Sequence, residues 1–372
     1  MTKKTRLTIL FICVACFLFI APVLVGYSMG YRFDFEKMKV TATGGIYVRT
    51  FPAPEQVFVD SKISEKPGIF SNSVFVQSLI PSMHSVLVKK TGYNDYSKTL
   101  PVLEKQVTKI ENILLIKKNL QFQLITDATQ SPFTNKEKFI IKNSNLYYSD
   151  AAENSSLTAL QKSTPLLKKI AAFMQQNNNI IWLGTDGLIY KSDISSLAST
   201  PTKITTTPIK ISKTGSYTIV GDSKNTFLND NGGLSILNTK TNELENLATT
   251  VKGIKVSPDE KNIIYYNDTN IYLAPISTEP IAKTSLYKSS EIINDCLWLN
   301  NDYVIFTAGD KIIISEIDFR SNVNSVALPQ TIVISPDQKI DIKVPQIFFN
   351  QKEGKLYILT NKVLLVSEKI TQ

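Results

Sequence analysis

The sequence predicts an all-β protein that follows a single N-terminal helix. Residues 7–27 form an apolar run without one charged side chain. From about residue 44 onward, short runs of β-branched and aromatic residues alternate with Gly, Asn, Asp or Pro, which is the pattern of strands joined by tight turns. With 43% apolar residues in 372, the chain can form more than one ordered core. We therefore expect two β domains after the helix.

The apolar run of residues 7–27 is long enough to cross a hydrocarbon core of about 30 Å as a helix. Lys3, Lys4 and Arg6 precede it, and a mixed set of charges follows. The positive-inside rule then places residues 1–6 in the cytoplasm and exports the rest. A cleaved signal peptide is the alternative, but the run is longer than the usual apolar segment of about 7–15 residues. We predict an uncleaved single-pass anchor in the lipid bilayer, followed by a linker over residues 28–43.

Residues 44–118 show a second pattern, in which apolar and polar residues alternate over short stretches. Examples are Val57, Val59 and the run from His84 to Lys89, with a turn expected through Lys66, Pro67 and Gly68. A period of two is typical of strands with one buried face, so the sequence predicts a small β-sandwich. His84, the one histidine, is expected to be a partly exposed strand residue.

This stretch resembles a PEGA domain, a small exported β module. The matching positions are Pro52, Val57, Val59, Asp60, Lys66, Pro67, Leu79, Pro81, Val86, Val88, Gly92 and Tyr93. Ser61 and Ser82 stand where the pattern has Gly, and the residues that name the family are reordered as Pro52-Ala53-Pro54-Glu55. The resemblance implies a structural or surface-interaction module without catalytic residues.

Residues 119–372 repeat a strand–turn–strand unit six times. The turns fall at residues 143–145, 186–187, 231–233, 268–269, 309–310 and 361–362, where Gly, Asn or Asp supplies the backbone conformation of a tight hairpin. Their spacing brackets the roughly 40 to 45 residues of a propeller blade. The sequence thus predicts a β-propeller of about six blades, with five to seven left open. A two-sheet sandwich or two smaller β domains are the alternatives.

Three details refine the repeat. The widest spacing predicts an insertion at residues 321–344, and residues 120–125 are expected to begin the ring or to close it against the last hairpin. Ser257-Pro258-Asp259-Glu260-Lys261 resembles the S-P-D-G-K turn of TolB-like propellers, with Glu260 in place of Gly. The whole arrangement resembles PEGA-containing single-pass membrane proteins with a TolB-like or WD40-like propeller.

The small numbers of histidines and arginines, together with the distribution of charge, exclude several kinds of functional site. One histidine cannot form imidazole pairs for a metal, and it lies outside the repeats, where a Ser-His-Asp site would need it. Arg320 is the single arginine of the repeats, too few for a sialidase-like clamp. The net charge is +9, but residues 119–372 are nearly neutral, so no nucleic acid is expected. Cys13 and Cys16 lie in the anchor, and Cys296 is expected to be a small buried apolar residue.

Acidic and aromatic residues leave two interpretations open. Asp186, Asp230, Asp268, Asp295 and Asp310 would have to converge to form the carboxylate pair of a glycosidase. Three of them occupy turn positions that favour Asp for backbone reasons alone. Trp182 and Trp298 precede or begin the hairpins of their repeats, which favours packing between blades over a sugar-stacking platform.

The sequence therefore predicts no catalytic, cofactor-binding or metal-binding residues. The favoured function is a non-catalytic, membrane-anchored envelope protein whose propeller is a binding scaffold for a protein or a cell-surface polymer. The alternative is an exported propeller hydrolase acting on glycans. A sensor that signals inward is disfavoured, because six residues precede the anchor.

Overall fold

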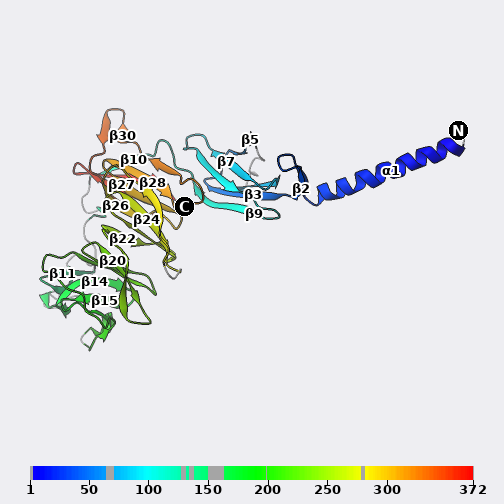
Figure 1. The fold of residues 1–372 in the computed structure, drawn as a ribbon. Coiled ribbons are helices and arrows are strands. Elements are labelled where there is room, and N and C mark those ends of the chain that lie inside the picture. Colours follow the sequence, from blue (N-terminus) through cyan, green and yellow to red (C-terminus); the bar gives the residue numbers. More distant parts are fainter. Residues whose placement is uncertain are drawn as a thin grey trace. The chain divides into compact units, whose positions relative to one another are not determined.

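The computed structural model describes residues 3–63, 71–126, 131–133, 138–149, 163–197, 199–277 and 281–371. These residues form one long helix followed by short strands, so the all-β prediction is confirmed (Figure 1). The chain divides into two compact units. Unit 1 comprises residues 1–119 together with 318–324, and unit 2 comprises residues 120–317 and 325–372. The turn predicted at Lys66, Pro67 and Gly68 lies outside the described residues.

The helix α1 spans Lys3–Ser28 and contains the whole predicted apolar run. Among the described residues it is the one helix long and apolar enough to cross a membrane, a property that a signal sequence near the N-terminus shares.

A β-hairpin follows α1 within the segment that was predicted to be a linker. It pairs β1 (Tyr31–Asp34) with β2 (Lys39–Ala42). The Asp34 carboxylate accepts hydrogen bonds from the backbone N–H groups of Glu36 (3.0 Å) and Lys37 (3.1 Å), which shapes the turn. At the base of the hairpin, Thr43 donates to the Gly30 carbonyl from both its backbone and its hydroxyl. Residues 28–43 therefore contain an ordered hairpin.

The remainder of unit 1 is a sandwich of two sheets. One sheet has the order β6-β3-β9 and the other β5-β4-β7-β8. The strands are β3 (Gly44–Phe51), β4 (Gln56–Val59), β5 (Lys62–Ile63), β6 (Ser73–Leu79), β7 (Met83–Lys89), β8 (Tyr96–Pro101) and β9 (Val107–Leu114). All pairs are antiparallel except β3 with β9. The inward residues of both sheets, such as Ile46, Val57, Val86 and Ile110, form a single buried core, as the alternation predicted.

The expectation that His84 is partly exposed is wrong, because His84 is only 7% exposed. The β4–β5 turn, with positive φ at Asp60 and Ser61, brings the Asp60 carboxylate over the imidazole. Asp60 Oδ2 lies 2.6 Å from His84 Nδ1, and the Ile80 carbonyl lies 2.7 Å from His84 Nε2. Both ring nitrogens therefore have partners, which allows the polar ring to be buried.

Unit 2 contains six sheets in chain order among its described residues, besides one separate hairpin (Figure 1). Their orders are β11-β12-β13, β14-β15-β16-β17, β18-β19-β20-β21, β22-β23-β24-β25, β26-β27-β28-β29 and β10-β34-β33-β32. The strands of the first three sheets are β11 (Phe139–Lys142), β12 (Asn145–Tyr148), β13 (Leu167–Lys168), β14 (Ile170–Gln176), β15 (Asn179–Gly184), β16 (Ile189–Asp193), β17 (Thr202–Lys203), β18 (Tyr217–Gly221), β19 (Thr226–Asp230), β20 (Gly233–Asn238) and β21 (Glu243–Ala248). The later strands are β22 (Gly253–Val256), β23 (Asn262–Tyr266), β24 (Asn270–Pro275), β25 (Thr284–Lys288), β26 (Ile293–Trp298), β27 (Tyr303–Ala308), β28 (Lys311–Glu316), β29 (Ser325–Ala327), β30 (Thr331–Ser335), β31 (Gln338–Asp341), β32 (Gln346–Asn350), β33 (Lys355–Thr360), β34 (Val363–Lys369) and β10 (Phe122–Ile125).

All six predicted hairpins are present. They are β11–β12, β15–β16, β19–β20, β23–β24, β27–β28 and β33–β34. Several turns contain consecutive residues with positive φ, such as Asn231 with Gly232 and Asn361 with Lys362. Glu260, which replaces the Gly of the S-P-D-G-K pattern, has φ of 58°, and Ser257 accepts from the Asn262 N–H at 2.9 Å to close the β22–β23 connection.

The two ends of unit 2 meet in the last sheet, where β10 pairs antiparallel with β34. The expected pairing of residues 120–125 with the last hairpin is confirmed. Successive sheets contact each other through their first strands, in the series β14, β18, β22, β26 and β32. The predicted insertion contains β29 and the extra hairpin β30–β31, and residues 318–324, which overlap its start, belong to unit 1. A closed ring of blades stays a prediction.

Candidate binding site at the turn end of the sheets

One end of the unit 2 sheets is built from the six hairpin turns and the connections that lead from each sheet to the next. We call it the turn end. Backbone hydrogen bonds join a turn to the connection that follows its sheet. Examples are Ile170 N–H to the Ser144 carbonyl (2.8 Å), Ile209 N–H to Gly187 (2.9 Å) and Val251 N–H to Gly232 (2.8 Å). In these three places the turn and the connection that follows its sheet are therefore held together by backbone hydrogen bonds.

A cavity of about 390 Å³ lies at the turn end of the second sheet. It is lined by Lys168, Lys169, Trp182, Asp186, Tyr190 and Pro201, among others. The Tyr190 hydroxyl donates to Asp186 Oδ2 at 2.6 Å, and the rings of Trp182 and Tyr190 stack at 5.7 Å. The hydrogen bond to Asp186, together with burial, raises the pKa of Tyr190, so its hydroxyl stays a neutral donor.

Trp182 does not form an open platform for a sugar ring. Its side chain is only 5% exposed and packs with Phe139, Leu146 and Ile170. Trp298 is equally buried, and its Nε1–H donates to the Lys255 carbonyl of the neighbouring sheet at 3.1 Å. Both tryptophans therefore pack between sheets, as the sequence indicated.

A second cavity, of about 410 Å³, lies at the turn end of the fourth sheet. Its lining includes Lys252 and Asp268. Lys252 Nζ lies 3.1 Å from Asp268 Oδ1 and donates to the Ile293 carbonyl at 2.8 Å. This cation and carboxylate supply both signs of charge to one small site.

The two cavities occupy corresponding positions in their sheets. Lys169 and Lys252 each directly precede the first strand, β14 or β22, and Asp186 and Asp268 each stand two residues after the second strand, β15 or β23. The other four sheets lack this combination at the corresponding described positions. Sequence reasoning missed the correspondence, because it requires knowing where each strand begins.

The five aspartates considered for glycan hydrolysis lie in four different sheets or their turns, and Asp295 and Asp310 share one sheet. Asp310 accepts from the Val344 N–H (2.8 Å), Asp230 from the Asn231 side chain (2.8 Å), and Asp295 from the Cys296 N–H (2.8 Å). Asp186 and Asp268 have the partners given above. The hydrogen bonds of Asp186, Asp230, Asp268 and Asp310 stay within one sheet or an adjoining connection, whereas Asp295 also accepts from the Tyr266 hydroxyl of the neighbouring sheet (3.2 Å). Among the described residues, no three His, Cys, Asp or Glu side chains are grouped for a metal ion.

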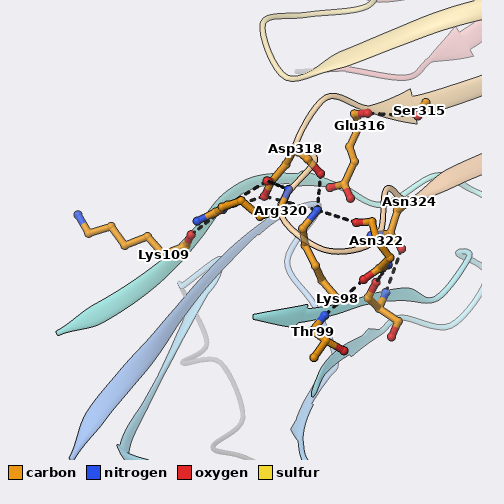
Figure 2. A network of polar contacts seen from close by, with 10 residues as sticks. Lys98, Thr99, Lys109, Ser315, Glu316, Asp318, Arg320, Asn322 and Asn324 are labelled. Atoms are coloured by element: carbon orange, nitrogen blue, oxygen red, sulfur yellow. Dashed lines mark hydrogen bonds and ion pairs between the residues drawn. The ribbon is translucent and has the colours of Figure 1, made fainter. Parts of the chain in front are cut away.

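Figure 2 shows polar contacts around residues 318–324, a segment that belongs to unit 1. Lys98 on β8 is fully buried, and its Nζ donates to the carbonyls of Asp318 (2.6 Å) and Asn322 (3.0 Å). Arg320 forms a forked ion pair with the Asp318 carboxylate (2.9 and 2.7 Å) and donates to the Lys109 carbonyl at 3.0 Å. The segment is thus fixed to β8 and β9.

Two asparagines of this segment complete the free edge of β8. Asn322 Nδ2 donates to the Ser97 carbonyl at 2.7 Å, and the N–H groups of Thr99 and Ser97 donate to Asn322 Oδ1 (3.4 Å) and Asn324 Oδ1 (3.3 Å). Burial raises the pKa of Asp318, but hydrogen bonds from Arg320 and the charge of Lys98 outweigh it, so the pKa lies below its usual value. The network covers an exposed strand edge, which is a structural task.

Cys296 is completely buried, as the sequence predicted. Burial, and then the nearby Asp295 carboxylate, raise the pKa of its thiol well above the usual value. The thiolate required for nucleophilic chemistry is therefore strongly disfavoured.

No protein-family model matches the sequence, and no curated protein matches it. Many solved structures are similar in fold. One is a chain from a Saccharomyces cerevisiae complex of a Dbp5 variant with Nup159, a Gle1 variant, IP6 and ADP, with 11% identity, a TM-score of 0.39, and coverage of 68% of this chain and 81% of that one. Another is the extracellular domain of a hybrid two-component system of B. thetaiotaomicron, with 8% identity and a TM-score of 0.43; the match covers 80% of this chain but 44% of that protein. A chain of the mitotic checkpoint complex has 11% identity and a TM-score of 0.41, covering 79% of this chain and 87% of that chain.

Proposed function

We propose that this protein is a non-catalytic, membrane-anchored envelope protein that binds a protein or a cell-surface polymer at the turn end of unit 2. The main support is the pair of corresponding cavities, each with a lysine and an aspartate. Two similar shallow sites on one surface suit a ligand that repeats its own chemistry, because the second contact is then intramolecular and raises the avidity.

The proposed anchor is α1, with residues 1–6 in the cytoplasm and both units outside it. The support is the apolar length of the helix and the three cations that precede its apolar run. Protease added to intact cells, or to spheroplasts, should remove both units. Protection under both conditions would reverse the orientation.

We further propose that the unit 1 sandwich is PEGA-like and that unit 2 is a propeller of the TolB-like or WD40-like kind. Ser61 and Glu260 both have positive φ, of 63° and 58°, and each stands where the corresponding pattern has Gly. The backbone of each turn is thus the one that the pattern requires, although the side chain differs.

The binding proposal is tested by capturing ligands through crosslinking on intact cells and then measuring their affinity for purified full-length protein. The variant Lys169→Ala with Lys252→Ala should weaken binding at least about tenfold, which corresponds to about 1.4 kcal/mol. Lys362→Ala is the matched control, because Lys362 is also an exposed turn-end lysine but lines neither cavity. Equal losses in both variants would contradict the site, and turnover of a captured glycan would favour the hydrolase instead.

A further inference from the structure

The β1–β2 hairpin presents its apolar face outward and its polar face inward. Phe33 and Val40 are direct cross-strand partners and are 41% and 65% exposed. Their neighbours Asp34 and Thr41, on the opposite face, are buried at 4% and 3% exposure. A hairpin in water shows the reverse arrangement. The outward face therefore needs an apolar neighbour.

The apolar face continues around the tip of the hairpin. Phe35 and Met38 are 79% and 73% exposed, and the rings of Phe33 and Phe35 contact each other edge to face at 5.0 Å. We call Phe33, Phe35, Met38 and Val40 the apolar tip. Lys37, Lys39 and Glu36 stand among these residues and are exposed, and Lys37 Nζ donates to the Pro81 carbonyl at 3.3 Å and lies 3.8 Å from Asp34 Oδ2. An apolar surface with cations beside it fits the boundary between lipid headgroups and acyl chains.

The inward face holds the hairpin in place. The Thr41 hydroxyl donates to Glu104 at 2.7 Å, and the Lys105 N–H donates to the Thr43 carbonyl at 3.1 Å. These contacts join the hairpin to the connection between β8 and β9. The tip is consequently a fixed feature of unit 1.

The hairpin is tied to the end of α1. Only Met29 and Gly30 separate the helix from β1. The Arg32 guanidinium lies 3.4 Å above the Tyr27 ring and donates to the Tyr27 carbonyl at 2.7 Å. A helix of 26 residues is about 39 Å long, which exceeds a hydrocarbon core of about 30 Å. The hairpin therefore begins within the interfacial layer of any bilayer that α1 spans.

We propose that the apolar tip inserts into the headgroup–acyl boundary of the leaflet from which α1 emerges, with Lys39 at the lipid phosphates. This inference rests on the proposed anchoring of α1. The partner is a lipid surface, because the tip is continuous with the membrane helix and combines apolar side chains with cations.

The test uses the full chain reconstituted in phosphatidylcholine vesicles that contain brominated lipid, with and without anionic phosphatidylglycerol. Phe35→Trp places a fluorophore at the tip, and the emission of wild-type protein, from Trp182 and Trp298, is subtracted. Phe348→Trp is the matched control, because Phe348 is an exposed phenylalanine of unit 2. We expect lipid quenching and a blue-shifted emission for the tip variant, more so with phosphatidylglycerol, and no lipid quenching for the control.

Flotation of the vesicles after an alkaline wash separates the two proposals. If the protein floats but the tip tryptophan is quenched by aqueous iodide and not by lipid, the anchor stands and the inference is overturned. Protection from both quenchers would show that protein covers the tip, and would also overturn it. If the protein does not float, the anchoring proposal fails.

Discussion

The two units differ in how far apart in the sequence their contacting strands lie. In unit 2, each full sheet except the last joins strands that follow one another along the chain. In unit 1, β3 pairs with β6 and, in parallel, with β9, while β4 pairs with β7. Unit 1 also includes a segment more than 200 residues away, whose Asp318 carbonyl accepts from Lys98. The sheets of unit 2 thus depend mainly on local hairpin turns. Unit 1 depends on contacts between residues far apart in the sequence, and bringing such residues together costs chain entropy.

The largest effect is expected where unit 1 depends on its distant segment. Lys98→Met removes the buried ammonium and leaves the Asp318 carboxylate and two carbonyls of the segment without that donor. Arg320 still pairs with that carboxylate, so the main cost is the loss of two hydrogen bonds from a charged donor to the carbonyls, about 1.5–3 kcal/mol each. Hydrogen exchange with peptide resolution should show residues 96–101 and 318–324 losing protection, while β33 and β34 keep theirs.

Lys109→Met is the matched control for this prediction. The Lys109 side chain is exposed and extends away from the network in Figure 2, where only its backbone carbonyl accepts from Arg320. This variant should change stability by less than about 0.5 kcal/mol. Unchanged protection of residues 318–324 in Lys98→Met would remove the proposed dependence of unit 1 on the segment.

The same difference, between local turns and contacts distant in the sequence, explains which parts of the structure the sequence predicts. Turns such as Asn231-Gly232 leave a local signal, because positive φ favours Asn and Gly, and all six hairpins were therefore found. Lys98 resembles any polar residue of an alternating strand, and its acceptors lie 220 and 224 residues away. The burial of His84 leaves no local signal for the same reason, since the β4–β5 turn brings its partner Asp60 over it. The two cavities are not predictable from the sequence, because the matching positions of their lysines and aspartates are defined by where the strands begin and end.

The next prediction concerns the turns on which unit 2 depends. Gly187 and Gly232 both have positive φ, so alanine at either site costs about 1–2 kcal/mol in backbone strain. At Gly187 an added Cβ would also clash with the Ile209 carbonyl oxygen, whereas at Gly232 the nearest atom is 3.6 Å away. Moving backbone at Gly187 adds about 1–3 kcal/mol. Urea unfolding should therefore rank Gly187→Ala clearly below Gly232→Ala.

Hydrogen exchange sharpens this second test. The Gly187 carbonyl accepts from the Ile209 N–H, so Gly187→Ala should loosen the connection before β18 as well as its own hairpin. Equal unfolding free energies for the two variants would mean that the backbone around Gly187 accommodates the added Cβ at little cost. That result would weaken the claim that unit 2 depends on its turns.

The smallest effect is expected between adjacent tyrosines of β23, which test the contacts of unit 2 that are not turns. The Tyr265 hydroxyl is buried without a hydrogen-bond partner among the described residues, whereas the Tyr266 hydroxyl donates to Asp295 at 3.2 Å. Tyr266→Phe should cost about 1 kcal/mol in unfolding free energy, and Tyr265→Phe should be neutral or slightly stabilising, because it removes an unsatisfied group.

The Tyr265 variant also carries a pH signature. Burial raises the pKa of Tyr265 to about 12, so its phenol ionises in the unfolded chain, near its usual pKa of about 10, before it ionises in the native protein. The native protein therefore keeps its full stability below about pH 10, and ionisation of Tyr265 in the unfolded chain lowers the unfolding free energy as the pH rises toward 12. Tyr265→Phe lacks this loss, so its advantage over wild type should grow in that window when urea unfolding is compared across pH. An advantage that stays constant with pH would place the phenol in contact with water, and packing between the third and fourth sheets would then be looser than the burial of Tyr265 implies.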